Sequence, residues 1–346
     1  MDGCCFNSLY GLQNELRFSD ASDQWTEVER GTICKMKSME RVKLRSHLAG
    51  ITTAFLMLAL GSVSLHAEIR SLLVDPQQTD PAIAEVRGPH LALYDPQVAS
   101  VHRLFVFLPG TGDRAERSLA IDSAFAKWGY HAVGLDYENS VLTVVCAHSL
   151  DSACFDHYRE AIVTGAPVSE KISVSPANSI LNRLEKLLLY LVKTDPEGGW
   201  DEFLEAGRPA WSRIVIAGHS QGSGHAAYIG KTFPVDRVLI FSGPQDYLDE
   251  LNEPAPWEAE PSATPLSRYF AFLNMKDPYD VHHQIASCAV LMNLAKPDPQ
   301  MVLPGEDVRG DSHILINDID TKQPHGSTLF PQFENVWKYM ASASVR

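Results

Sequence analysis

The sequence lacks the short patterns that bind metals and nucleotides, and it has no excess of positive charge. Its 346 residues contain no C-x-x-C or H-E-x-x-H pattern of the kind that ligates zinc. Neither the G-x-x-x-x-G-K-[ST] nor the G-x-G-x-x-G phosphate-binding loop occurs. The formal net charge is −14, the opposite of the basic face that nucleic-acid-binding proteins present. We therefore expect no metal site and no nucleic-acid partner.

Cysteine is scarce, and three of the six cysteines lie near the N-terminus. Cys146 and Cys154 flank a short polar loop and are predicted to form a disulfide in an oxidising compartment. A metal site made of these two cysteines with His148 and His157 is the alternative. Cys288 lies in an apolar helical pattern and is expected to be a buried thiol.

The first 67 residues have the layout of a leader. Residues 39–67 run from a basic segment through an apolar stretch to small residues before a cleavage point after Ala67, as in a secretory signal peptide. Residues 1–38 are polar and lie where such a peptide should already have begun. We expect them to be a disordered upstream extension, with the true start at Met36 or Met39. The chain is then periplasmic or secreted after cleavage; the alternative is a retained apolar segment that anchors it in a membrane.

Residues 68–346 alternate strand and helix patterns and are expected to form a single domain. Alternation of this kind predicts an α/β fold with a doubly wound, mostly parallel sheet and helices on both faces. Residues 138–174 show no regular pattern and are expected to be an irregular insert. The expected strands are 101–108, 131–137, 211–217, 236–241, 269–274 and 312–316, and the expected helices are 118–128, 178–193, 222–231, 283–295 and 332–343.

One strand-to-helix junction carries the strongest chemical signal. The apolar run 214–217 leads into Gly218-His219-Ser220-Gln221-Gly222, and small residues compatible with a helix follow. A strand, a sharp turn and a helix with serine at the apex predict a nucleophile elbow. The glycines would leave room where strand and helix cross. The alternative is a glycine-rich turn with an ordinary serine.

A serine nucleophile needs a base, a carboxylate that orients the base, and donors for the oxyanion. After an elbow, the carboxylate and then the histidine are expected further along the chain. Asp277 directly follows the predicted strand 269–274, and Asp246, after the preceding strand, is its rival. His325 lies between the last predicted strand and the last predicted helix, where the base is expected.

Two backbone amides are the candidates for the oxyanion hole. One follows the nucleophile, which makes it the amide of Gln221, and the other comes from the loop after an early strand. That loop is 109–113, where Thr111 is the predicted donor because Gly110 allows close approach of the backbone. The Thr111 hydroxyl could add a second hydrogen bond. A plain glycine-rich turn is the alternative.

These residues, in this order, resemble the α/β-hydrolase superfamily, specifically secreted bacterial serine esterases and lipase-like enzymes. The resemblance covers about residues 100–346. It implies a sheet of about eight strands, a covalent acyl-enzyme on Ser220, a small-molecule ester substrate and no cofactor. Many relatives have His-Gly or a longer glycine run where this chain has Pro109-Gly110. Another serine-hydrolase activity (peptidase, thioesterase or acyltransferase) and a non-catalytic binding protein on the same fold are the alternatives.

Overall fold

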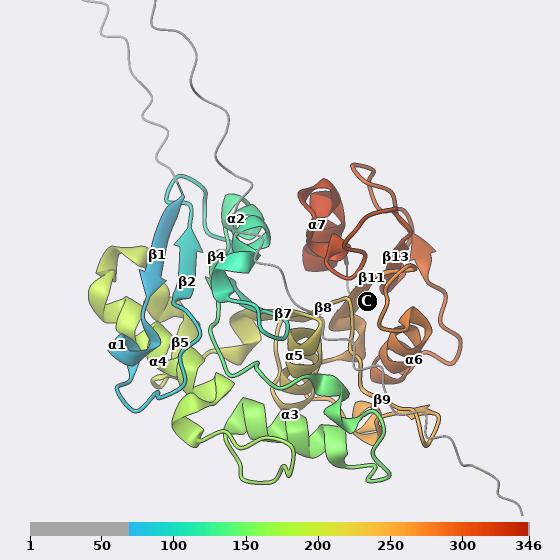
Figure 1. Cartoon of the computed structure of the whole chain (residues 1–346). Helices are drawn as coiled ribbons and strands as arrows, with labels where there is room; N and C mark the ends of the chain where they lie inside the picture. Colours follow the sequence, from blue (N-terminus) through green and yellow to red (C-terminus); the bar gives the residue numbers. More distant parts are fainter. Residues whose placement is uncertain (1–68, 345–346) are drawn as a thin grey trace, which may run out of the picture. The chain divides into compact units, whose positions relative to one another are not determined.

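The computed structural model describes residues 69–344, so the predicted signal peptide and the extension before it lie outside the described residues. Nine strands form the main sheet, in the order β1-β2-β4-β3-β7-β8-β11-β13-β12 (Figure 1). β1, β2 and β4 pair antiparallel, and every other neighbouring pair is parallel. The strands are β1 (Arg70–Val74), β2 (His90–Tyr94), β3 (Leu104–Leu108), β4 (His131–Gly134), β7 (Ile214–His219), β8 (Arg237–Phe241), β11 (Tyr269–Asn274), β12 (Gln300–Met301) and β13 (Ile314–Asn317).

The described sheet has nine strands where the resemblance implied about eight. The six strands expected from the sequence correspond to β3, β4, β7, β8, β11 and β13, and the structure adds β1, β2 and the two-residue edge strand β12. Two further hairpins lie outside the main sheet, β5 (Leu204–Glu205) with β6 (Arg208–Pro209) and β9 (Tyr247–Leu248) with β10 (Glu253–Pro254). The α-helices are α1 (Pro76–Thr79), α2 (Leu119–Lys127), α3 (Cys154–Thr164), α4 (Ile180–Thr194), α5 (Gln221–Thr232), α6 (Val281–Leu291) and α7 (Glu334–Ser342). Within residues 69–344, none of them is long and apolar enough to cross a membrane.

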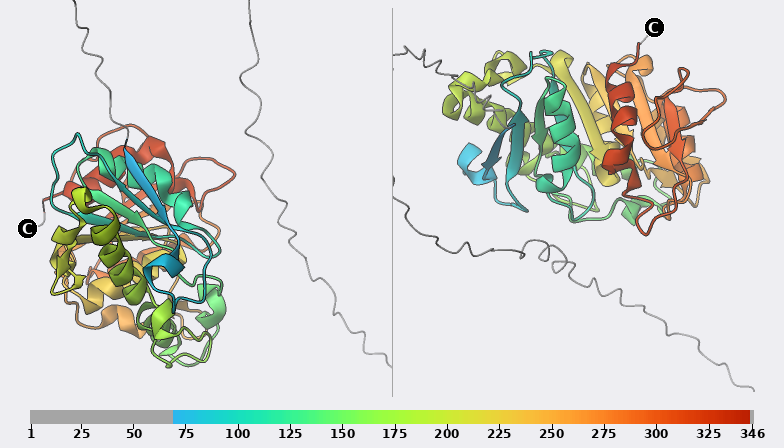
Figure 2. Two further views of the ribbon diagram at one scale, coloured as in Figure 1. Left: turned by 90° about the vertical axis from the view of Figure 1, so that its left-hand side faces the viewer. Right: turned by 90° about the horizontal axis from the view of Figure 1, so that it is seen from above.

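Helices cover both faces of the sheet, because successive side chains of a strand point to opposite sides. In β3, Leu104 and Val106 belong to one buried cluster, and Phe105 and Phe107 to another. The apolar faces of α3, α4, α5 and α6 complete the first cluster, and those of α2 and α7 complete the second (Figures 1 and 2). The predicted α/β class, with a mostly parallel sheet covered on both faces, is confirmed.

The insert at 138–174 differs from the expectation, because it contains the helix α3. This helix ends at Gly165, whose φ of 80° places it in the left-handed region that favours glycine. Phe155, Tyr158 and Ile162 lie three to four residues apart on its buried side. Charged and polar residues fill the positions between them and hide this spacing in the sequence.

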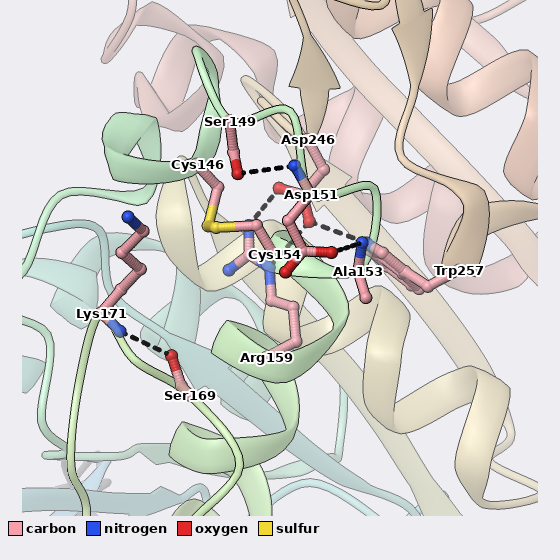
Figure 3. The surroundings of a disulfide bond; sticks show 10 residues. All are labelled: Cys146, Ser149, Asp151, Ala153, Cys154, Arg159, Ser169, Lys171, Asp246 and Trp257. Carbon is pink, nitrogen blue, oxygen red and sulfur yellow. Dashed lines mark hydrogen bonds and ion pairs between the residues drawn. A yellow bond between two sulfur atoms is a disulfide. The ribbon is translucent and has the colours of Figure 1, made fainter.

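Cys146 and Cys154 are joined in a disulfide, and Cys154 is the first residue of α3 (Figure 3). Both thiols are therefore engaged and cannot ligate a metal with His148 and His157. Cys288 is a free thiol and fully buried. The disulfide ties the start of α3 to the chain that leaves β4.

Replacing both Cys146 and Cys154 with serine is expected to lower the free energy of unfolding by about 2–3 kcal/mol. The short loop that the disulfide closes would regain its freedom in the unfolded chain. Urea unfolding with and without dithiothreitol measures the effect. The reductant should bring the wild type to the stability of the double variant and leave the variant unchanged. Equal stability of the oxidised wild type and the variant would contradict the prediction.

Candidate active site

Ser220 lies at the sharp turn between β7 and α5. Its backbone has φ 55° and ψ −122°, a conformation that a residue with a side chain rarely adopts. The surrounding structure holds it there, since the Ser220 amide donates to the carbonyl oxygen of Phe241 on β8 at 2.9 Å. The turn places the serine at the carboxyl end of the sheet, where parallel α/β sheets gather their functional groups.

The two glycines of the motif allow strand and helix to cross. A Cβ atom on Gly218 would lie 2.2 Å from the carbonyl carbon of Gly222. A Cβ atom on Gly222 would lie 2.0 Å from the carbonyl oxygen of Leu108 on β3. Both contacts are with backbone, which cannot rotate away. The two glycines of the motif are therefore required by close backbone contacts around Ser220.

Replacing Gly222 with alanine is expected to lower the free energy of unfolding by about 1–3 kcal/mol or more, because β3 or α5 must shift to admit the methyl group. Chemical denaturation measures the change. Gly326→Ala is the matched control, since the nearest atom to a Cβ there is 3.9 Å away. Equal stability of the two variants would contradict the prediction.

His325 and Asp277 are brought together from separate loops. His325 Nδ1 lies 2.8 Å from Asp277 Oδ2. The other carboxylate oxygen of Asp277 accepts from the amide of Tyr279 at 2.9 Å. Burial raises the pKa of Asp277, but the hydrogen bond and charge of His325, together with the Tyr279 amide, outweigh it and hold that pKa below its ordinary value. Asp277 is therefore an ionised acceptor for His325 at neutral pH.

The other ring nitrogen of His325 is buried, and it has no hydrogen-bond partner among residues 69–344. The loop that carries His325 lies against the elbow, because the ring of His219 contacts it, with ring centroids 4.7 Å apart. A ring held at Nδ1 and unengaged at Nε2 has the geometry of a general base.

Asp246, the rival carboxylate, serves a different group. Its side chain is fully buried and paired with Arg159 of α3, whose Nε lies 3.0 Å from Asp246 Oδ2 (Figure 3). The indole Nε1 of Trp257 donates to the same oxygen at 3.0 Å. The Asp246 carboxylate is therefore engaged by Arg159 of α3 and by Trp257. Of the two candidate acids, only Asp277 has a hydrogen bond to His325 within the described residues.

Arg159 is a residue that the sequence interpretation missed. Its side chain is fully buried, and its Nη1 donates to the carbonyl oxygen of Gln221 at 2.7 Å. The Arg159 side chain lies directly against α5, since a Cβ atom on Gly224 would be 2.1 Å from Arg159 Nη2. Gly224, the third glycine of the 218–224 segment, was the available signal, because a residue without a side chain leaves room for another side chain to cross.

The loop after β3 lies against the nucleophile. A Cβ atom on Gly110 would be 3.1 Å from Ser220 Cβ. Within residues 69–344, no hydrogen bond from the amides of Thr111 and Gln221 is found, so both N–H groups are available to an oxyanion. The Thr111 hydroxyl, expected as a possible extra donor, instead donates to Gln221 Oε1 at 2.6 Å.

Two side chains that follow β4 support this loop, and both were missed from the sequence. The Tyr137 hydroxyl donates to the carbonyl oxygen of Pro109 at 2.6 Å. The Asn139 side-chain amide donates to the carbonyl oxygens of Gly110 and Asp113, at 2.7 and 2.8 Å. Burial raises the pKa of Asp113 itself, while the charges of Arg117 and His325 oppose the rise. The loop 109–113 is thus held by side chains from the segment that follows the neighbouring strand β4.

Comparison with known proteins identifies no close relative. No protein-family model matches the sequence, and no curated protein does. Among solved structures, a bacterial heroin esterase is similar, with 16% identity, a TM-score of 0.36 and 80% of this chain covering 79% of that one. A Klebsiella pneumoniae protein assigned as a dienelactone hydrolase has 10% identity, a TM-score of 0.39 and coverages of 80% and 99%. A thermophilic carboxylesterase cloned from a metagenomic library has 13% identity, a TM-score of 0.38 and coverages of 79% and 85%.

Similarities with TM-scores below 0.5 do not indicate an activity, so a function can be inferred only from the residues of the site. The fold is recognisable from this chain alone. A mostly parallel sheet covered on both faces, with a serine at a strained turn between a central strand and the following helix, is the α/β-hydrolase fold.

Proposed function

We propose that this protein is a serine hydrolase that cleaves carboxylic esters through an acyl-enzyme on Ser220. One observation carries the proposal. His325 is held at Nδ1 by the Asp277 carboxylate, 2.8 Å away, while its Nε2 has no partner among residues 69–344. The ring of His325 contacts that of His219, the residue directly before Ser220 at the strained turn.

The proposed reaction has two proton-balanced halves. Ser220 Oγ attacks the ester carbonyl as His325 Nε2 accepts its proton, and the amides of Thr111 and Gln221 bind the oxyanion. His325 then gives the proton to the departing alcohol as the acyl–oxygen bond breaks. Water attacks the acyl-enzyme by the same route, and the acid leaves as Ser220 regains its proton. Asp277 orients His325 and stabilises its protonated form.

Two alternative functions differ in what they require of these residues. A peptidase, thioesterase or acyltransferase would need the same nucleophile, base and oxyanion donors, so the ester assignment is the most specific part of the proposal. A non-catalytic binding protein would need none of them. The unengaged Thr111 and Gln221 amides beside Ser220 favour an enzyme, because a binding protein gains nothing from donors placed around a serine hydroxyl.

Labelling with a fluorophosphonate separates these readings. The purified chain should form a covalent adduct, and peptide mass spectrometry should place it on Ser220. A panel of short-chain esters, thioesters and peptides then ranks the activities by kcat/KM, and we expect esters to rank first. Absence of any adduct would favour the binding protein, and faster cleavage of thioesters or peptides would overturn the ester assignment.

We also propose that the chain is exported, with residues 39–67 as a cleaved signal peptide. The disulfide between Cys146 and Cys154 supports an oxidising compartment. N-terminal sequencing of the natural protein should find a start just after Ala67. A start upstream of Met36 would refute the expected start site. A membrane-bound product that retains residues 39–67 would favour the anchored alternative.

A further inference from the structure

A second histidine lies against His325, within the elbow itself. His219 is the last residue of β7, and its Nε2 lies 2.9 Å from the backbone carbonyl oxygen of His325. Because a carbonyl oxygen can only accept, the hydrogen is on Nε2 and His219 is the donor. The proposed reaction gives this histidine no role, and its position next to the nucleophile calls for one.

His219 is kept neutral by its surroundings. Burial lowers the pKa of His219 to about 3, and the charge of neighbouring His325 acts in the same direction. Its Nδ1 therefore carries no hydrogen, and this edge of the ring faces the oxyanion loop, since a Cβ atom on Gly110 would be 3.2 Å from it. A neutral donor can bind the His325 backbone without opposing the positive charge that His325 gains when it takes a proton.

The same carbonyl oxygen has a second donor. The Ser242 hydroxyl, which follows β8, donates to it at 2.6 Å and lies 2.8 Å from the Thr328 hydroxyl. Both lone pairs of the His325 carbonyl are therefore occupied, one from the end of β7 and one from the end of β8. Together with Asp277 at Nδ1, these donors fix the histidine at three points.

We propose that His219 is a positioning residue for His325: its Nε2–H holds the His325 backbone so that the free ring nitrogen faces Ser220. The inference rests on the proposed function. A displacement of about 1 Å at a catalytic group can cost about 10²-fold in rate. His219 contacts His325 and the oxyanion loop, so its loss should reduce kcat and leave KM largely unchanged.

The test compares His219→Gln with His219→Asn in the full chain. A glutamine amide reaches about as far from Cα as the histidine Nε2, whereas an asparagine amide ends near the position of Nδ1. We expect His219→Asn to lower kcat about 10- to 100-fold with KM within about threefold of wild type. His219→Gln should restore most of the lost kcat. Circular dichroism and urea unfolding establish that both variants are folded.

His131→Asn is the matched control. His131 is 7% exposed against 6% for His219, and its Nε2 lies 2.6 Å from the carbonyl oxygen of Gly198. His131 begins β4, whereas Ser220 follows the end of β7, and these strands run parallel, so the two residues lie at opposite ends of the strands. The His131 variant should therefore lose stability but keep kcat.

Equal kcat values for His131→Asn and His219→Asn, or no gain from glutamine over asparagine, would show that His219 is only structural. If neither His219 variant folds, Ser242→Ala decides the question, because it removes the other donor to the same carbonyl. An unchanged kcat in Ser242→Ala would then overturn the proposal. Failure of the proposed function is seen separately, as a wild-type protein that neither turns over esters nor reacts at Ser220.

Discussion

Replacing Ser220 with alanine is expected to reduce ester turnover by about 10⁴- to 10⁶-fold. In the proposed mechanism, the substitution removes the atom that forms the acyl-enzyme and leaves the Thr111 and Gln221 amides and the His325–Asp277 pair in place. What remains should be the slow attack of water on an ester bound beside the oxyanion hole. Initial rates on a chromogenic ester, with active-site titration of the wild type, give the ratio directly.

The same substitution should leave the stability almost unchanged. Within residues 69–344 no hydrogen bond to Ser220 Oγ is found, so no partner loses its bond when the hydroxyl is removed. The strained backbone is equally unfavourable for alanine, and the change should stay within about 0.5 kcal/mol. Ser212→Ala is the control, an exposed serine just before β7, at the opposite end of the same strand. A Ser220→Ala rate within tenfold of the Ser212→Ala rate would remove Ser220 from the mechanism.

The elbow was predictable because both glycines lie within two residues of Ser220, so the sequence displays them as one short pattern. Gly218 is required by its close approach to Gly222, and Gly222 by its close approach to Leu108 on the adjacent strand β3. The proximity of Asp277 and His325 was predictable from the order of the strands. In a parallel sheet, the loops after successive strands meet at one edge, so the order of strands along the chain predicts which loops meet.

The supporting residues could not be predicted, because their partners are distant and their signals are weak. Arg159 reaches Gln221 across 62 residues of chain and Asp246 across 87. Its helix lies in a stretch whose polar residues hide the apolar spacing. The roles of Asn139 and His219 depend on which backbone carbonyl each side chain faces, and a residue's identity does not specify that. The candidate site residues were thus visible in the sequence, and the structure was needed to find the side chains that hold them in place.

The buried pair of Arg159 and Asp246 leads to the largest expected effect on stability. Asp246→Asn is expected to lower the free energy of unfolding by about 3–5 kcal/mol, because it leaves the Arg159 guanidinium in the interior without its counter-ion. Asp277→Asn is the matched control. Asp277 is also buried, but its partner His325 can stay neutral, so this variant should lose kcat by about 10⁴-fold with little loss of stability. If Asp246 rather than Asp277 were the carboxylate that orients His325, the two variants would exchange their effects on kcat.

Glu258 determines how much of the expected loss of about 3–5 kcal/mol in the free energy of unfolding Asp246→Asn shows. Glu258 is fully buried, and burial first and the charge of Asp246 second raise its pKa well above the ordinary value, so it is neutral in the wild type. Neutralising Asp246 removes the second cause, and Glu258 can then ionise and become a substitute counter-ion for Arg159.

The double variant Asp246→Asn/Glu258→Gln blocks this route. It should lose more free energy of unfolding than the two single variants lose together. Urea unfolding at one pH of the wild type, Asp246→Asn, Glu258→Gln and the double variant gives the coupling free energy between the two substitutions. An additive result would mean that Glu258 does not compensate for Asp246, and a loss below about 1 kcal/mol in the double variant would mean that Arg159 does not depend on a buried counter-ion.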